Sequence, residues 1–398
     1  MDITIYPGKL SGTVQAIPSK SQAHRILICS AFSDAPVNIL CPQTNQDIEA
    51  TAGCLRALGA DITRTDDGYT VIPIHNIPKS AVIDCCESGS TLRFMLPICA
   101  SLGIDTTILM SGRLPKRPLS PLWEELERMG CILTRPTESS LRCQGRLHSG
   151  NYVIDGSVSS QFITGLIFAI ALLPGENTLT VTGQIESKPY IDMTEQVLRS
   201  FGVDTSGYGF NDAYPFHSPG TIAVEGDWSN GAFFLAANKL GNDITVTGLS
   251  MESRQGDLAC SEILDKLSEP ITVCGKDIPD LIPILSVVAG ASKGAVFQNV
   301  GRLRLKESDR VEAVREMLSA LGASVTVEGD TLTVSPAQYS GGIIDSKNDH
   351  RIAMSAAIAS TAASEPVTIL GAECVKKSYP DFWSEFTRLG GHYEQYIR

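Results

Sequence analysis

A polar stretch near the N-terminus combines residue types that could bind an anion. The turn Pro18-Ser19-Lys20-Ser21 is followed by Arg25 and then by the apolar run Ile26-Leu27-Ile28-Cys29. Proline and serine favour a turn and a helix N-cap, where free backbone N–H groups and the helix dipole attract anions. Lys20 and Arg25 add two positive charges. The stretch indicates a phosphate or carboxylate pocket, but an ordinary capped helix with two solvated cations explains it equally well.

Five further stretches place cations, hydroxyls or carboxylates at expected helix starts or in a stiff loop. They are Glu87-Ser88-Gly89-Ser90-Thr91-Leu92-Arg93, Arg113-Leu114-Pro115-Lys116-Arg117-Pro118, Ser159-Ser160-Gln161, Lys306-Glu307-Ser308-Asp309-Arg310 and Asn348-Asp349-His350-Arg351. Taken singly, charges in a first turn are more often solvated or paired along the helix. Together, seven cations on an acidic chain predict a ligand pair rich in phosphate and carboxylate. These cations are Lys20, Arg25, Arg93, Arg113, Lys306, Arg310 and Arg351.

Composition limits the classes of protein to which the chain could belong. Its 398 residues are enough for about two domains, and 43% apolar with 19% charged residues is typical of a folded, water-soluble protein. A net charge of −12 argues against nucleic acid or an anionic membrane as partner. The longest apolar run, at residues 162–173, is too short to span a bilayer.

Cysteine usage and the N-terminus point to the cytoplasm. The eleven cysteines include no C-x-x-C pair and no cluster with zinc-ligand spacing, so we expect free thiols and no metal. The first residues lack the basic region and apolar core of a signal peptide.

The elements that must position these motifs recur along the chain. An apolar residue followed by glycine ends one series of amphipathic helices, at Leu58-Gly59, Met129-Gly130, Phe201-Gly202, Leu321-Gly322 and Leu389-Gly390. A second series begins with a polar turn and continues into a strongly apolar, buried helix, as at residues 281–289 and 352–363. With the β-rich pieces between them, both series predict six units of about 65 residues.

The joint motif set resembles that of the 5-enolpyruvylshikimate-3-phosphate synthase family, in order and across nearly the whole chain. The stretch Ser187-Lys188-Pro189-Tyr190-Ile191-Asp192 belongs to this set, with the opening turn, Ser159-Ser160-Gln161, Lys306-Glu307-Ser308-Asp309-Arg310 and Asn348-Asp349-His350-Arg351. The resemblance implies transfer of the carboxyvinyl group of phosphoenolpyruvate to the 5-hydroxyl of shikimate 3-phosphate, through a tetrahedral intermediate and with release of phosphate. It implies no metal or organic cofactor, and we expect a monomer.

The resemblance also implies an α/β (α+β) fold of two domains, each an inside-out barrel of three βαβαββ repeats around buried helices. One domain, at residues 18–220, is inserted into the other, at 1–17 and 221–398, and the Pro-, Gly- and Ser-rich loop from Pro215 to Gly220 suits the second crossing. Two crossings form a hinge on which the domains would close over the substrates.

Site residues follow from the resemblance, position by position. Shikimate 3-phosphate would be bound by Lys20, Ser21, Arg25, Ser159, Ser160, Gln161, Ser187, Tyr190, Asp280 and Lys306. Phosphoenolpyruvate would be bound by Lys20, Gly89, Arg93, Arg113, Gln161, Arg310, Asp349, His350, Arg351 and Lys377. Asp280 would act as base near the attacking hydroxyl, Glu307 would deliver and recover the proton at the methylene carbon, and Lys20 would touch both substrates.

Three positions depart from the family pattern. Glu87 stands where many members have asparagine, Phe94 replaces a common proline, and Arg302 replaces an asparagine before the Lys-Glu motif. These departures leave open the response to glyphosate, an inhibitor that the family binds near Gly89.

Two alternative functions share parts of this motif pattern. The sister carboxyvinyl transferase that acts on UDP-N-acetylglucosamine uses a cysteine in a mobile loop, but the corresponding loop, 112–118, has none. A non-catalytic repeat protein that only binds anions would not need Asp280 and Glu307. An assay for phosphate release separates that protein from an enzyme.

Overall fold

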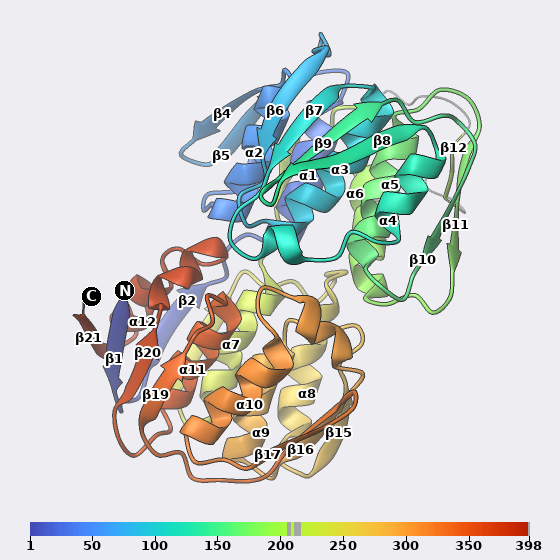
Figure 1. Cartoon of the computed structure of the whole chain (residues 1–398). Helices are drawn as coiled ribbons and strands as arrows, with labels where there is room; N and C mark the ends of the chain where they lie inside the picture. The colour runs from blue at the N-terminus through green and yellow to red at the C-terminus, as the bar shows by residue number, and fades with distance from the viewer. Residues whose placement is uncertain (205–207, 211–215, 397–398) are drawn as a thin grey trace. The chain divides into compact units, whose positions relative to one another are not determined.

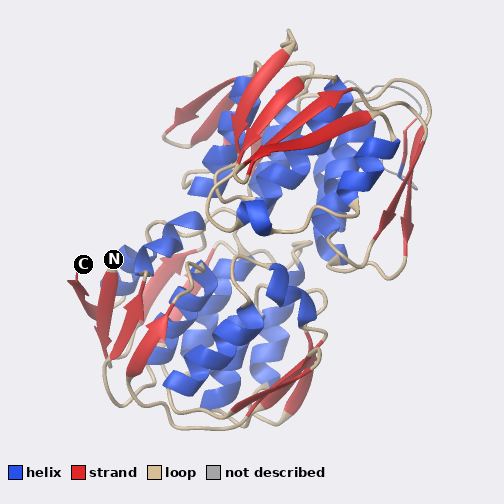
Figure 2. Cartoon of the chain, in the orientation of Figure 1, coloured by secondary structure: helices blue, strands red, loops and turns tan. Residues whose placement is uncertain are grey.

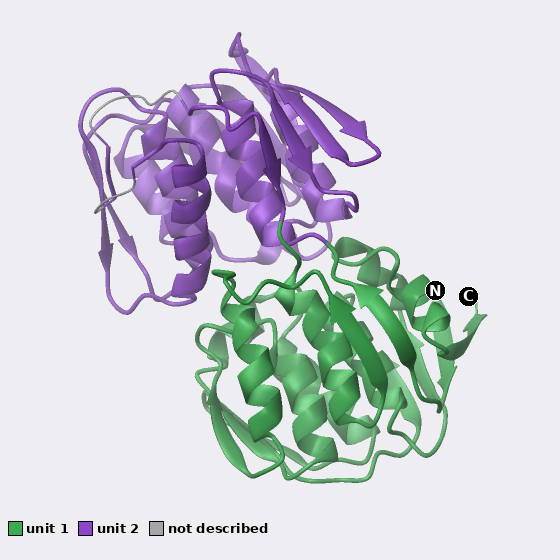
Figure 3. Cartoon of the chain, turned by 180° about the vertical axis from the view of Figure 1, so that it is seen from behind, with its two compact units in different colours: residues 1–17, 225–398 green, residues 18–224 purple. Residues whose placement is uncertain are grey.

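The structure is a computed structural model that describes residues 1–204, 208–210 and 216–396. The chain forms two compact units, which are coloured separately in Figure 3. Unit 1 contains Met1–Ile17 and Glu225–Arg398, and unit 2 contains Pro18–Val224. Both mix helices and strands, as expected for the α/β (α+β) class, with helices inside each unit and strands on its outside (Figure 2).

In unit 2 the described strands form three sheets (Figure 1). Their orders are β13-β3-β5-β4, β6-β7-β9-β8 and β10-β11-β12. The strands are β3 (Val37–Leu40), β4 (Asp61–Thr65), β5 (Gly68–Ile72), β6 (Ser80–Asp84), β7 (Asp105–Leu109), β8 (Cys131–Thr137), β9 (Ser140–Gly145), β10 (Asn151–Asp155), β11 (Asn177–Thr182), β12 (Gly209–Phe210) and β13 (Thr221–Ala223). Each sheet has one parallel pair followed by antiparallel neighbours, the pattern that a βαβ crossover and a hairpin produce.

Two sheets of unit 1, β15-β16-β18-β17 and β19-β20-β1-β21, have the same plan, and its third described sheet, β14-β2, is a parallel pair. The strands of unit 1 are β1 (Asp2–Tyr6), β2 (Ser11–Gln15), β14 (Asp243–Thr247), β15 (Ile271–Cys274), β16 (Ala295–Gln298), β17 (Val325–Glu328), β18 (Thr331–Val334), β19 (Gly342–Asp345), β20 (Val367–Leu370) and β21 (His392–Tyr396). The first strand, β1, lies between β20 and β21 near the C-terminus, which explains why this unit is discontinuous.

The crossing between the units follows β13 rather than preceding it. The sequence suggested a boundary between residues 220 and 221, whereas unit 2 continues to Val224. The reason is strand pairing: β13 runs parallel to β3, with Thr221 opposite Asn38, and so completes a sheet of unit 2. Pro215, part of the loop proposed for this crossing, lies outside the described residues.

Both helix series predicted from the repeat pattern are present, the amphipathic helices and the buried helices that follow polar turns. In unit 2 they are α1 (Lys20–Ala31), α2 (Gln46–Ala57), α3 (Gly89–Leu102), η1 (Leu114–Lys116), α4 (Leu122–Arg128), α5 (Ser160–Ala171) and α6 (Lys188–Ser200). In unit 1 they are α7 (Trp228–Lys239), η3 (Gly256–Ala259), α8 (Cys260–Lys266), α9 (Ile282–Ala291), η4 (Gly301–Leu305), α10 (Arg310–Ala320), α11 (His350–Ser360), η5 (Ala372–Lys377) and α12 (Phe382–Arg388). Helices α1, α3, α5, α7, α9 and α11 fill the two cores.

The helices that follow the polar turns are buried on nearly every side. All residues of α5 are buried except Gln161 in its first turn. The five glycines predicted to follow the amphipathic helices all have positive φ: Gly59, Gly130, Gly202, Gly322 and Gly390. No helix in the described part of the chain is both long enough and apolar enough to serve as a membrane span.

One glycine sets the distance between two core helices. A Cβ atom on Gly165 of α5 would lie only 2.1 Å from the backbone oxygen of Arg93 on α3. The two helix backbones therefore touch, and any larger residue would push them apart. This contact fixes the second turn of α5 against α3, the helix that carries Arg93.

Candidate active site

Helix α1 begins at Lys20, as the opening turn predicted, but without a hydroxyl cap. The N-cap residue is Ser19, and its side chain makes no capping hydrogen bond. The Nζ atom of Lys20 instead lies 2.8 Å from a carboxylate oxygen of Asp47 in the first turn of α2. The site cation is thus held by a carboxylate that the motif analysis did not include.

Arg25 is buried and binds groups of three helices. Its Nε donates to Thr194 Oγ1 on α6 at 2.8 Å, and its Nη2 donates to the backbone oxygen of Tyr190 at 2.8 Å and to Thr164 Oγ1 on α5 at 3.4 Å. The guanidinium also lies 5.2 Å from the ring centre of Phe94. Phe94, which replaces a proline common in the family, therefore makes a cation–π contact with Arg25, a predicted site residue.

Arg93 and Gln161 meet where α3 and α5 begin. Nη1 of Arg93 donates to Gln161 Oε1 at 2.7 Å, and Gln161 Nε2 donates to Ser90 Oγ at 2.9 Å. The local capping residues fix these starts, because Ser88 accepts from the backbone N–H of Thr91 and Ser159 accepts from that of Gln161. The two motifs, far apart in the sequence, thus share one hydrogen-bonded cluster.

A second arginine approaches the start of α3. A Cβ atom on Gly89 would lie 2.6 Å from Nη1 of Arg117 and 2.8 Å from Nη1 of Arg93. Arg117 is buried, whereas Arg113, the predicted ligand in the same loop, is exposed. Glu87 packs against the other side of this loop, since its carboxylate would be 2.4 Å from a Cβ on Gly112. The sequence did not predict Arg117 as a site residue, although the loop that contains it, 113–118, was among the candidate stretches.

The remaining predicted residues of unit 2 lie at the starts of α1, α5 and α6. Ser187 precedes α6 with a left-handed backbone, φ 53°, and its side chain is buried. Tyr190 contributes its backbone oxygen to Arg25, as does Ser21. In unit 2 the predicted residues near the starts of four mutually packed helices, α1, α3, α5 and α6, are Lys20, Ser21, Arg25, Gly89, Arg93, Ser159, Ser160, Gln161, Ser187 and Tyr190.

In unit 1 a carboxylate lies among three cations. Oδ1 of Asp280 accepts from Nη1 of Arg310 at 2.7 Å, and its Oδ2 accepts from Nη2 of Arg351 at 3.2 Å. The Nζ atom of Lys306 lies 3.6 Å from Oδ1. Asp280 comes just before α9, which begins at Ile282, within one residue of the apolar helical run predicted at 281–289.

Arg310 is the centre of this cluster. It opens α10, whose N-cap is Asp309, and its side chain is only 1% exposed. Besides Asp280 it binds Glu307 Oε2 at 2.7 Å through Nη2 and Asp349 Oδ2 at 2.8 Å through Nε. Three carboxylates around one guanidinium compensate its burial.

Arg351 is oriented by the start of α7. Its Nη1 donates to the backbone oxygen of Ser229 at 2.9 Å and its Nη2 to the Ser229 hydroxyl at 2.8 Å. That hydroxyl in turn donates to Asp227, the N-cap of α7, at 2.5 Å. Nothing in the sequence around Ser229 indicated a contact with Arg351, which lies 122 residues away.

The last motif closes the cluster. Asp349 caps α11 and accepts from the backbone N–H of Arg351, and His350 is buried beside it with Nδ1 3.9 Å from Asp349 Oδ1. Lys377, in η5, donates to the backbone oxygen of Asn348 at 2.8 Å. All predicted site residues of unit 1 thus lie around the N-terminal ends of α9, α10 and α11.

The electrostatics of this cluster follow from burial and charge. Burial alone would raise the pKa of Asp280, but Arg351, Lys306 and Arg310 overcome it and hold that pKa well below its usual range. Burial lowers the pKa of Lys306 to about 8, although Asp280 acts in the opposite direction. Asp280 is therefore a carboxylate at neutral pH, and Lys306 titrates close to neutral pH.

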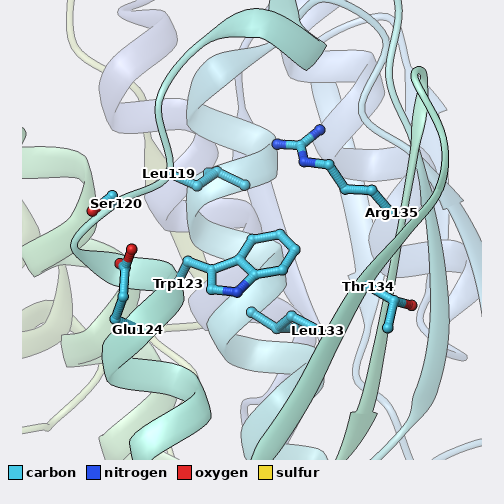
Figure 4. Close-up of a pocket in the computed structure, with 7 residues that line it drawn as sticks. All are labelled: Leu119, Ser120, Trp123, Glu124, Leu133, Thr134 and Arg135. Atoms are coloured by element: carbon cyan, nitrogen blue, oxygen red, sulfur yellow. The ribbon is translucent and has the colours of Figure 1, made fainter.

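One pocket lies away from these residues. Between α4 and β8 a pocket of about 650 Å³ is lined by Leu119, Trp123, Leu133 and Arg135, among others (Figure 4), and it contains none of the predicted site residues. No group of three His, Cys, Asp or Glu side chains within residues 1–204, 208–210 and 216–396 could hold a metal ion.

Comparison with known proteins defines the class and then the family. The fold is that of enolpyruvyl transferases of known structure. EPSP synthase from Acinetobacter baumannii has a TM-score of 0.80 at 24% identity, covering 99% of this chain and 100% of that one. The enolpyruvyl transferase NikO from Streptomyces tendae has a TM-score of 0.75 at 18% identity, covering 99% and 98%.

Sequence relatives specify the family. The model of the family EPSP synthase (3-phosphoshikimate 1-carboxyvinyltransferase) matches residues 5–277 and 268–386. The chain is 37% identical to the 3-phosphoshikimate 1-carboxyvinyltransferase of Clostridium botulinum (strain Alaska E43), and 38% identical to that of Clostridium perfringens (strain ATCC 13124), with 98% of each chain covered. The chain belongs to the EPSP synthase family, which confirms the resemblance found in its motifs.

Proposed function

We propose that the chain is a 3-phosphoshikimate 1-carboxyvinyltransferase of the shikimate pathway to aromatic amino acids. It transfers the carboxyvinyl group of phosphoenolpyruvate to the 5-hydroxyl of shikimate 3-phosphate and releases phosphate. Its relatives carry this name over nearly their full length, which favours this reaction over transfer to UDP-N-acetylglucosamine. The observation that carries the proposal is the Asp280 carboxylate held among Arg310, Arg351 and Lys306.

In this proposal the cluster of unit 2 binds most of shikimate 3-phosphate. Ser159, Ser160 and Gln161 lie at the start of α5, whose backbone N–H groups suit the phosphate. Arg25 is already engaged by Thr194 and Tyr190, so it contributes mainly by fixing α1 against α6. The other residues of this set are Lys20, Ser21, Ser187, Tyr190, Asp280 and Lys306.

Phosphoenolpyruvate is bound by the cations at the helix starts. Arg93 lies beside Gly89, where the missing side chain allows close approach to the backbone. Arg310 and Arg351 carry the positive charge of the unit 1 cluster. The other residues of this set are Lys20, Arg113, Gln161, Asp349, His350 and Lys377.

The chemistry is addition followed by elimination. Glu307 protonates the methylene carbon of phosphoenolpyruvate, and the neighbouring carbon becomes electron-poor. The 5-hydroxyl attacks that carbon and gives its proton to Asp280, which forms the tetrahedral intermediate. Elimination then returns a proton from the new methyl group to Glu307, and phosphate leaves with the proton that Asp280 accepted, so both carboxyl groups return to their starting states. Each acid–base step contributes roughly 10²–10⁴ in rate.

Positioning accounts for much of the remaining acceleration. Two polyanions repel each other in water, so the cations must supply the energy that holds them in contact. Orientation of two bound reactants can contribute about 7–11 kcal/mol, and fixed cations stabilise the charge that develops during the reaction.

An assay for phosphate release tests the proposal. Phosphate should appear only when shikimate 3-phosphate and phosphoenolpyruvate are both present. Lys20→Ala and Glu307→Ala should each lose most turnover while circular dichroism shows an unchanged fold. Release with UDP-N-acetylglucosamine as acceptor would favour the sister reaction, and calorimetric binding of shikimate 3-phosphate without release would favour a non-catalytic protein. Near-normal rates in both variants would refute these residue roles.

We propose further that the enzyme acts in the cytoplasm as a monomer, on small molecules rather than on nucleic acid or membranes. Nine of its eleven cysteines are buried free thiols, which suits a reducing compartment. The net charge of −12 suits neither nucleic acid nor an anionic membrane.

A further inference from the structure

Helices α1 and α2 of unit 2, labelled in Figure 1, are joined by two side-chain contacts that lie one turn apart. The outer contact is the ion pair of Lys20 with Asp47, whose atoms are 2.8 Å apart. The inner contact joins His24 Nδ1 to Thr51 Oγ1 at 2.7 Å, and both side chains are fully buried. His24 follows Lys20 by one helical turn, and Thr51 follows Asp47 in the same way. The inner contact therefore fixes the register in which the outer one forms.

Helix α3 is tied to both contacts through one hydroxyl. Thr91 Oγ1 lies 2.7 Å from Thr51 Oγ1 and donates to Ser88 Oγ at 2.8 Å, and the backbone oxygen of Asp47 lies 3.4 Å from it. Ser88 is the N-cap of α3. A chain of buried polar groups thus runs from α1 through α2 to the helix end that presents Gly89.

The available protons fix the direction of donation along this series of hydrogen bonds. Thr91 donates to Ser88, so Thr51 donates to Thr91, and the Nδ1–H of His24 donates to Thr51. Nε2 of His24 is buried and has no hydrogen-bond partner among the described residues, so burying it as a bare nitrogen avoids an unsatisfied N–H. Burial, together with Lys20 and Arg25, holds the pKa of His24 well below its usual range, and the ring is neutral.

We propose that His24, Thr51 and Thr91 are positioning residues for phosphoenolpyruvate binding: they hold the starts of α1 and α3 in register, so that Lys20 and the Gly89–Arg93 turn face one ligand. The inference rests on the proposed function. None of the three touches substrate. The groups assigned to shikimate 3-phosphate on α5 and α6 are held by other contacts, such as those of Arg25 with Thr194 and Tyr190.

Kinetics of Thr51→Val test the proposal, because valine keeps the shape of threonine and removes its hydroxyl. The KM for phosphoenolpyruvate should rise about tenfold, since two buried partners lose their hydrogen bond. The KM for shikimate 3-phosphate should rise less, by about twofold, because only its ligands Lys20, Ser21 and Arg25 lie on α1 and those on α5 and α6 are held by other contacts. Thr51→Ser keeps the hydroxyl and should restore the wild-type KM values.

Thr106→Val is the matched control for lost stability. Thr106 is a fully buried threonine of β7 in the same unit, and its hydroxyl bonds away from the helix starts, to the backbone oxygen of Ile104 at 3.1 Å and to Cys99 near the C-terminal end of α3. This variant should lower the melting temperature without changing either KM. If Thr51→Val does not fold, Thr91→Val removes the next hydroxyl in the chain and should give the same selective rise.

An unchanged KM for phosphoenolpyruvate in a folded Thr51→Val or Thr91→Val enzyme would overturn the proposal. So would equal rises in both KM values, or a rise that Thr106→Val reproduces. These outcomes are distinct from failure of the proposed function, in which the wild-type chain itself would release no phosphate from the two substrates.

Discussion

Asp280 and Arg310 form a short contact within the unit 1 carboxylate–cation cluster, with Oδ1 2.7 Å from Nη1. The same carboxylate binds Arg351 through its other oxygen and has Lys306 within 3.6 Å. One negative charge therefore separates three positive ones. An incoming anionic substrate would compete with Asp280 for these cations, and that competition would free the carboxylate to accept a proton.

Asp280→Asn should lower turnover by about 10²–10⁴. The amide cannot accept the hydroxyl proton, and it no longer separates the charges of Arg310 and Arg351. Asp265→Asn is the matched control, because Asp265 is 77% exposed and pairs with Lys239 on the surface. Steady-state rates and circular dichroism measure the effect. Retention of more than half the wild-type rate by a folded Asp280→Asn enzyme would contradict the role of Asp280 as base.

The activity should fall as pH rises through about 8, the pKa that burial gives Lys306. Lysine is charged below its pKa, so the cation is present at neutral pH and is lost on the alkaline side. Lys306→Arg keeps the charge and should move the alkaline limb of kcat/KM to higher pH. The exposed Lys293→Arg should leave the profile unchanged. An identical alkaline limb in Lys306→Arg would assign it to another group.

Gly89→Ala should weaken phosphoenolpyruvate binding without destabilising the fold. The new Cβ would meet Nη1 of Arg117 at 2.6 Å and Nη1 of Arg93 at 2.8 Å, and both are ends of flexible side chains that can move. We expect the KM for phosphoenolpyruvate to rise about tenfold or more and the melting temperature to stay within about 2 °C. Gly53→Ala, in open space on α2, is the control. A wild-type KM would show that the guanidinium positions do not matter.

Local sequence predicted where the functional helices begin because short-range chemistry decides it. Ser88, Ser159 and Asp349 cap their helices through backbone N–H groups two or three residues ahead. The positions of the glycines after the amphipathic helices could likewise be predicted from local sequence. Ser19 was the exception, since its hydroxyl does not cap α1.

Partners that lie far along the chain could not be predicted in this way. Asp47 binds Lys20, and Ser229 binds Arg351 from 122 residues away. Their positions depend on how sheets and core helices pack, and neither residue has a distinctive local pattern. The same holds for β13, whose pairing with β3 extends unit 2 beyond the predicted boundary.

Gly165→Ala should destabilise unit 2, in contrast to Gly89→Ala. Its Cβ would lie 2.1 Å from the backbone oxygen of Arg93, and backbone atoms of two core helices cannot move as a side chain can. We expect a loss of about 1–3 kcal/mol in the free energy of unfolding, as for other overpacked cores. Denaturant unfolding measures it, and Gly53→Ala should instead gain roughly 0.5–1 kcal/mol, because alanine is the better helix former. Separation of α3 from α5 would also break the hydrogen bond of Arg93 to Gln161, so the remaining folded enzyme should bind phosphoenolpyruvate more weakly. Wild-type stability in Gly165→Ala would mean that the two helices are not in backbone contact.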